Sequence, residues 1–228
     1  SRTASVGRAV IADLPRRARR GYAAGPDIMP TRNSGFLVQH RGVADLLVPL
    51  VEPALGIAHH ALDAALEPPS WHCVGVFGAE LGAVQSVSLI RSNFGDPGNL
   101  EAVARAGERL AAFWRGCEPG AAWSEPFVLS FGVAGDPALI QGRWGHRGCF
   151  ELCAPLARGG LGHWFRDNDT AGLPWRGPAT FGEAIGRFEA VALAQSDAGE
   201  AGPLEMVARV QGGDRLLHFR CGPDRAWH

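Results

Sequence analysis

Residues 139–175 read LIQGRWGHRGCFELCAPLARGGLGHWFRDNDTAGLPW, in which short apolar segments alternate with glycine, proline, aspartate and asparagine. Such alternation is typical of short β-strands joined by tight turns. Trp175, which ends this stretch, belongs to a series of tryptophans that recur every 52 residues, at Trp71, Trp123, Trp175 and Trp227. A fixed period of this length predicts a tandem repeat of β-rich units.

Other landmarks keep nearly the same period. A Phe-Gly pair opens three successive units, at Phe77-Gly78, Phe131-Gly132 and Phe181-Gly182. Leu-Ile-Arg-Ser (89–92), Leu-Ile-Gln-Gly (139–142) and Leu-Ala-Gln-Ser (193–196) follow them in order. A more divergent copy precedes these three, so the predicted repeats are 21–72, 73–124, 125–176 and 177–228. Residues 1–20 form an Arg-rich extension, which favours a solvated or strand-pairing arm over a phosphate-binding role.

The length of the repeat predicts the fold class. Four short strands with their turns occupy roughly 40–50 residues, which is the size of one propeller blade. A β-trefoil would need three copies, and a solenoid turn is normally shorter. We therefore expect an all-β protein, a β-propeller of about four ~52-residue repeats, forming one domain over residues 21–228. Residues 100–112 would tolerate a helix, but their counterpart 149–155 predicts a strand.

Composition excludes several functions. The formal net charge is −1, which gives no general attraction to nucleic acid or to an anionic membrane. The chain has no lysine, so Schiff-base chemistry is excluded, and its exclusive use of arginine suggests a GC-rich bacterial genome. Five cysteines without a CxxC pair predict mostly reduced, buried thiols.

No cofactor and no metal site is expected, because no phosphate loop, dinucleotide fingerprint or metal-ligand spacing is present. No apolar run reaches membrane-spanning length. Residues 1–20 also lack the apolar segment of a signal peptide, which leaves open a cytoplasmic or a secreted location.

Aromatic residues next to arginine and acidic or amide side chains indicate where a ligand binds. A sugar needs hydrogen-bonding groups for its hydroxyls and an aromatic surface for its C–H face. Alternatively, Arg166 pairs with Asp167 or Asp169 within a turn, and each recurring tryptophan is a wedge between blades. The candidate ligand-binding residues are Trp114, Arg115, Trp123, Trp164, Arg166, Asp167, Asn168, Asp169 and Trp175.

Two runs resemble the repeat of the Photorhabdus-type fucose-binding lectins. They are GHWFRDND (162–169) with GLPW (172–175), and LIRSNFG (89–95) with GNLE (98–101). The resemblance implies a β-propeller with sugar pockets between adjacent blades, and as ligand fucose or a related sugar, including a methylated one. Those lectins carry seven repeats, so the four repeats here predict either a four-bladed ring or part of a larger one.

The first repeat suggests two alternatives. It holds half of the eight histidines, and His40 and His60 replace Ser92/Gly142 and Trp164 of other copies. With Asp63 they are candidates for acid–base catalysis on a propeller scaffold. A purely structural or protein-binding propeller is the other alternative. The expected partner is a glycan or another small molecule, and a homo-oligomer stays open.

Overall fold

The computed structural model describes residues 36–40, 42–51, 55–64, 66–198 and 202–228. Within these ranges the chain forms fifteen β-strands and two 3₁₀ helices of three residues each, Ala79–Leu81 and Glu183–Ile185. The predicted all-β class is therefore confirmed. The Arg-rich extension at residues 1–20, expected to be a solvated or strand-pairing arm, lies outside the described residues.

The strands form four antiparallel sheets, each built from consecutive strands. Sheet 1 contains β1 (Leu37–His40), β2 (Val43–Pro49), β3 (Ile57–Asp63) and β4 (Ser70–Phe77). Sheet 2 contains β5 (Ser86–Arg91), β6 (Leu100–Ala106), β7 (Arg109–Arg115) and β8 (Phe127–Ser130). Sheet 3 contains β9 (Ala138–Gln141), β10 (Phe150–Pro155), β11 (Leu161–Arg166) and β12 (Trp175–Phe181). Sheet 4 contains β13 (Phe188–Gln195), β14 (Leu204–Val210) and β15 (Leu216–Cys221).

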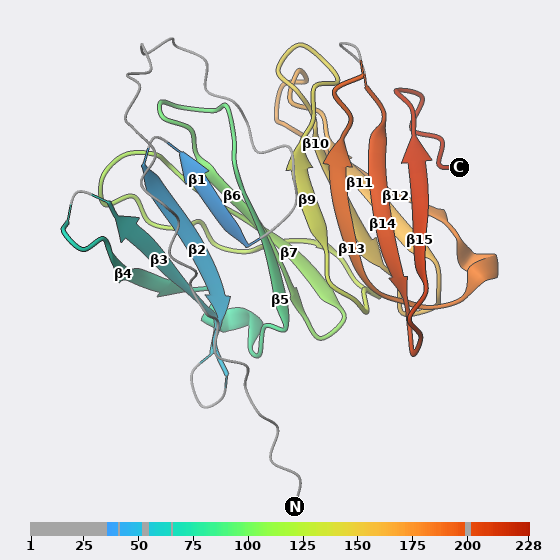
Figure 1. Cartoon of the computed structure of the whole chain (residues 1–228), viewed down its shortest axis with the longest axis horizontal. Coiled ribbons are helices and arrows are strands. Elements are labelled where there is room, and N and C mark those ends of the chain that lie inside the picture. The colour runs from blue at the N-terminus through green and yellow to red at the C-terminus, as the bar shows by residue number, and fades with distance from the viewer. Residues whose placement is uncertain (1–35, 41, 52–54, 65, 199–201) are drawn as a thin grey trace, which may run out of the picture.

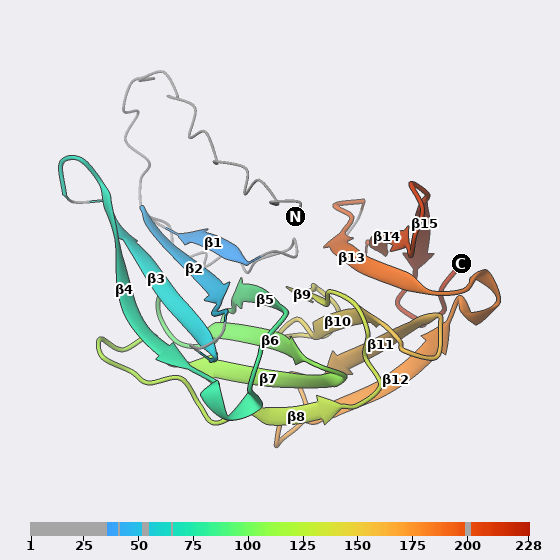
Figure 2. The same ribbon diagram turned by 90° about the horizontal axis from the view of Figure 1, so that it is seen from below.

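The sheets follow one another around an arc, with sheet 1 and sheet 4 at its two ends (Figure 1 and Figure 2). The first strand of each sheet lies toward the inside of the arc, where β1 contacts β5, β5 contacts β9 and β9 contacts β13. This arrangement is propeller-like. Within the described ranges no β-ladder joins sheet 1 to sheet 4, so closure into a ring remains a prediction.

The core lies between neighbouring sheets, because each inner sheet is covered on both faces. All six residues of β10 are buried, whereas a sheet with one solvent-facing side would alternate. Five apolar residues that recur at matching positions of the repeats lie in this core, and all five are at most 2% exposed. These residues are Leu89, Ile90, Leu139, Ile140 and Leu193.

Two of the outer strands cross predicted repeat boundaries. β4 runs through the boundary after residue 72, and β12 runs through the boundary after residue 176. In sheets 1 and 3 the last strand pairs with the third strand over its full length, so these two sheets end at the Phe-Gly landmark. Residues 100–112 form β6 and most of β7, as predicted against their helical propensity.

All five cysteines are free, and Cys149, Cys153 and Cys221 are buried, so most of the thiols are buried as predicted. Burial raises the pKa of the Cys221 thiol to about 12 and that of Cys153 well above its ordinary value. Among the described residues, no helix has the length and apolar character needed to cross a membrane.

Candidate functional site

Sheets 1 and 2 meet through a buried acid–histidine pair. His59 Nε2 on β3 donates to Asp45 Oδ1 on β2 over 2.9 Å, and Arg91 of sheet 2 also donates to this carboxylate. The Trp123 indole of sheet 2 meets the edge of the His59 ring and stacks on Phe77, with centroids 4.3 Å apart and planes at 10°. The indole therefore fills the space between these two sheets.

Sheets 3 and 4 repeat the same arrangement. His163 Nε2 donates to Glu151 over 2.8 Å, and Arg225 donates to the other oxygen of that carboxylate over 3.2 Å. Trp227 meets the edge of the His163 ring and stacks on Phe181, with centroids 4.8 Å apart. The recurring tryptophan is thus a wedge at this contact as well.

The contact between sheets 2 and 3 lacks two of these parts. In the β6–β7 ladder, Ala112 stands opposite Val103, the register position at which His59 and His163 stand in their own sheets. Ser130 pairs with Leu110, where Phe77 and Phe181 pair with Ile57 and Leu161. Trp175 therefore finds neither ring partner, and the space beside it stays open.

The result is a cleft of about 360 Å³, which is within the size range of small-molecule sites. Aromatic side chains form much of its wall: Trp114, Phe127, Phe150 and Trp175. Trp114 stands directly opposite Glu101 in the β6–β7 ladder, so both side chains emerge on the same face of sheet 2. Trp114 is 54% exposed, which leaves its indole accessible to a ligand that enters the cleft.

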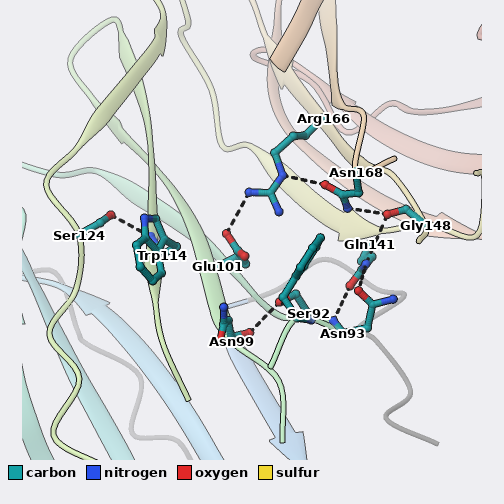
Figure 3. A network of polar contacts seen from close by, with 11 residues as sticks. Ser92, Asn93, Asn99, Glu101, Trp114, Ser124, Gln141, Gly148, Arg166 and Asn168 are labelled. Carbon is teal, nitrogen blue, oxygen red and sulfur yellow. Dashed lines mark hydrogen bonds and ion pairs between the residues drawn. The ribbon is translucent and has the colours of Figure 1, made fainter. Parts of the chain in front are cut away.

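The polar part of the cleft is an ion pair between the two sheets. Arg166 Nη1 lies 3.4 Å from Glu101 Oε2, and the guanidinium lies over the Phe150 ring, 3.8 Å from its centroid. Arg166 Nε donates to Asn168 Oδ1 over 2.8 Å, and Asn168 Nδ2 donates to the Gly148 carbonyl (Figure 3). The orientation of Arg166 is therefore fixed before any ligand arrives.

The acid in the cleft has a different pKa shift from the acid at the filled contact between sheets 1 and 2. Burial raises the pKa of Glu101 to about 7, because Arg166 and Ser92 offset only part of the cost of burying the carboxylate. Burial also acts to raise the pKa of Asp45, but the hydrogen bond from His59 and the charge of Arg91 outweigh it, so this pKa is lowered. Without a histidine partner, Glu101 changes its protonation state near neutral pH.

The loop after Arg166 braces the rim of the site. Asp169 accepts hydrogen bonds from the backbone N–H groups of His146 and Arg147, at 2.6 and 2.9 Å. Asp167 accepts from the Thr170 hydroxyl over 2.7 Å and so closes its own turn. Among the described residues, Arg166 pairs with Glu101 and Asn168 and not with Asp167 or Asp169, so the expected pairing within the turn is not found.

The structure brings three of the nine predicted ligand-binding residues to the cleft, namely Trp114, Arg166 and Trp175. Asn168 supports Arg166 from behind, and Asp167 and Asp169 lie at the neighbouring loop. Trp123 fills the contact with sheet 1, and Trp164 is buried in the core between sheets 2 and 3. Arg115 donates through Nε to the Ala121 carbonyl and lies outside the cleft lining.

The three candidate catalytic residues lie in sheet 1. His60 follows the buried His59 on β3 and emerges on the opposite face of the sheet, at the register position of Trp164 in sheet 3. His40 ends β1, and Asp63 ends β3. None of the three lines the cleft between sheets 2 and 3.

Reasoning from the sequence missed Glu101, Ala112 and Phe127. Glu101 was visible as a landmark of the repeat, but its partner Arg166 comes from the next sheet. The available signal was the absence of a histidine in the second repeat, where Ala112 replaces it. The spacing of the repeats aligns Phe131 with Phe77, yet the structure leaves Phe131 exposed and puts Ser130 at the pairing position.

The fold and the cleft together define an all-β protein of successive antiparallel sheets in a propeller-like arc. No family model and no curated protein matches the chain. Among solved structures it is similar to the BP39L lectin from Burkholderia pseudomallei, with a TM-score of 0.55 and 18% sequence identity. The match covers 82% of this chain and 50% of the lectin chain, so the chain spans about half the length of that protein.

Proposed function

We propose that the cleft between sheets 2 and 3 binds a carbohydrate. The observation that carries the proposal is that Trp175 has no stacking partner, because Ser130 stands at that position, so an aromatic-walled cleft remains where the other contacts are filled. Trp114 and Trp175 offer flat surfaces to the C–H face of a sugar ring. Arg166 and Glu101 offer a donor and an acceptor to its hydroxyls.

The finer proposal is fucose or a related, methylated sugar as the ligand, held in the pocket between two blades of a propeller. It is supported by the resemblance of residues 162–169 and 89–95 to fucose-binding lectin repeats, and by the arc-like fold. A methyl substituent suits a pocket whose wall is largely aromatic and aliphatic.

A glycan array followed by calorimetry with the best sugar tests the proposal. We expect binding that falls at least about tenfold in Trp114→Ala and in Trp175→Ala. Phe131→Ala is the matched control, because Phe131 is an exposed aromatic residue next to the same sheet and lies outside the cleft. Silence across the array from protein with normal near-UV circular dichroism would refute carbohydrate binding.

Equal weakening by Phe131→Ala would show that the sugar binds somewhere else. Binding of galactosides or glucosides without fucosides or methylated sugars would retain the cleft as a carbohydrate site and refute only the finer proposal.

A further inference from the structure

The outward face of sheet 4 carries the parts of a contact between sheets, and no described strand covers this face. His218 Nε2 donates to Glu205 over 2.7 Å, as His163 donates to Glu151 in sheet 3. The register is the same, since Val207 pairs with His218 and Cys153 pairs with His163. The sheet 3 pair is buried by sheet 4, at 1% and 0% side-chain exposure, whereas the sheet 4 pair is 62% and 31% exposed.

The rest of this face follows the same pattern. In β14 and β15 every second side chain points into the core with sheet 3, and the side chains between them point outward. Val207 and Leu216 are exposed members of this outward set. Their register counterparts in sheet 3, Cys153 and Leu161, are fully buried under sheet 4. Sheet 4 therefore presents a surface that, in the sheets before it, a following sheet covers.

The outward face of sheet 1 is the complementary half. Trp71 pairs with Leu62, the register position that Trp123 and Trp227 hold in sheets 2 and 4. Those two indoles reach back over the histidine of the preceding sheet. In the part of the chain that the structure describes, no sheet precedes Trp71, which is 41% exposed, and Leu62 beside it is half-buried.

The arginine pattern at the two ends of the arc also fits a contact between them, because sheet 1 lacks the usual arginines and Glu205 already has one. At the three contacts within the chain, the following sheet supplies an arginine to the acid, namely Arg91, Arg166 or Arg225. Sheet 1 has Gln39 and Leu62 at the register positions of Arg91 and Arg166, so it brings neither. Glu205 is instead neutralised from within its own sheet, by Arg220 Nε at 3.4 Å.

We propose that two copies of this chain associate head to tail, with the Trp71 face of sheet 1 of each copy on the His218–Glu205 face of sheet 4 of the other. Two four-sheet arcs then form a closed ring with two identical contacts, which removes both exposed faces. The proposal is independent of the ligand in the cleft.

Sedimentation velocity of the full chain over a range of concentrations tests the association. We expect a dimer, and we expect its dissociation constant to rise at least about tenfold in Trp71→Glu and in Leu216→Glu. Leu216 is 65% exposed, so the charge disturbs no core packing. Phe131→Ala, at an exposed position directly after β8, is the matched control and should leave the dimer unchanged.

Mixing the two variants separates a head-to-tail contact from a face-to-face one. Trp71→Glu retains an intact sheet 4 and Leu216→Glu retains an intact sheet 1, so an equimolar mixture should recover a 1:1 dimer through one contact. A wild-type protein that stays monomeric would overturn the proposal. A dimer that survives either substitution alone, or a mixture that recovers nothing, would overturn it equally.

Discussion

Trp227 lies flat on Phe181, with the ring planes 5° apart and the centroids separated by 4.8 Å. Trp123 makes the same contact with Phe77. Trp175 completes the series along the sequence, yet the residue at the corresponding position is Ser130. The recurring tryptophan therefore fills two of the contacts between sheets and lines an open cleft at the third.

Filling the cleft should abolish binding without harming the fold. The double variant Ala112→His, Ser130→Phe restores the two residues that accompany the tryptophan at the other contacts, so Trp175 gains a stacking partner and Glu101 gains a histidine. We expect no measurable carbohydrate affinity and a free energy of unfolding within about 1 kcal/mol of wild type or higher. Calorimetry and urea denaturation check the two expectations. Retained affinity in a folded double variant would place the binding site outside this cleft.

The wedge and cleft tryptophans should differ in their effect on stability. Trp123→Ala removes the stack on Phe77 and the contact with His59, and should cost about 3 kcal/mol of unfolding free energy. Trp175→Ala should cost clearly less, because one side of that indole already faces the cleft. Chemical denaturation of both variants measures the difference, and equal costs would contradict the distinction.

Stability should fall as the pH rises from about 4.5 to about 7. Burial raises the pKa of Glu101 to about 7, so the folded protein keeps a proton that the unfolded chain has released. The contribution is complete below pH 4.5, is lost by about pH 7, and amounts to roughly 3 kcal/mol at most. Comparing the pH dependence of unfolding in wild type and Glu101→Gln isolates it, since the amide of the variant does not titrate. Parallel curves would refute this role for Glu101.

Ligand affinity should change in the opposite direction with pH. A sugar hydroxyl donates its hydrogen to an ionised carboxylate, so the ligand favours the deprotonated form of Glu101. We expect the association constant to rise between about pH 6 and pH 8 and then level off. Calorimetry across this range measures the change, with Glu101→Gln as the variant whose affinity should be weaker and independent of pH. An affinity of the wild type that is flat over the same range would contradict contact between the ligand and Glu101.

The cysteines should react in an order set by burial. Cys73 is exposed and should be labelled by a thiol reagent in the native protein. Cys153 and Cys221 are buried, and burial raises the pKa of both thiols, so they should react only after unfolding. Mass spectrometry of peptides labelled before and after denaturation gives the order. Native labelling of Cys153 ahead of Cys73 would contradict the burial found for β10.

The sequence by itself determined the strands and their sheet-by-sheet order. Periodic tryptophans, Phe-Gly pairs and apolar segments between turn residues are local or fixed-period signals, and a strand pattern depends on neighbours in the chain. It also identified Trp114, Arg166 and Trp175 as ligand candidates. Their chemistry as aromatic and arginine side chains was visible without any knowledge of their surroundings.

Only the tertiary structure decided which sheet contact is open. The cleft depends on Ala112 and Ser130, whose small side chains carry no chemical signal. It also depends on the register of the β7–β8 ladder, which pairs Leu110 with Ser130 and leaves Phe131 exposed. It also decided that Arg166 pairs with Glu101, a residue 65 positions away on another sheet. Whether small side chains leave a gap, and which residues pair across it, depends on the surfaces of both facing sheets. The sequence of one sheet alone therefore does not reveal it.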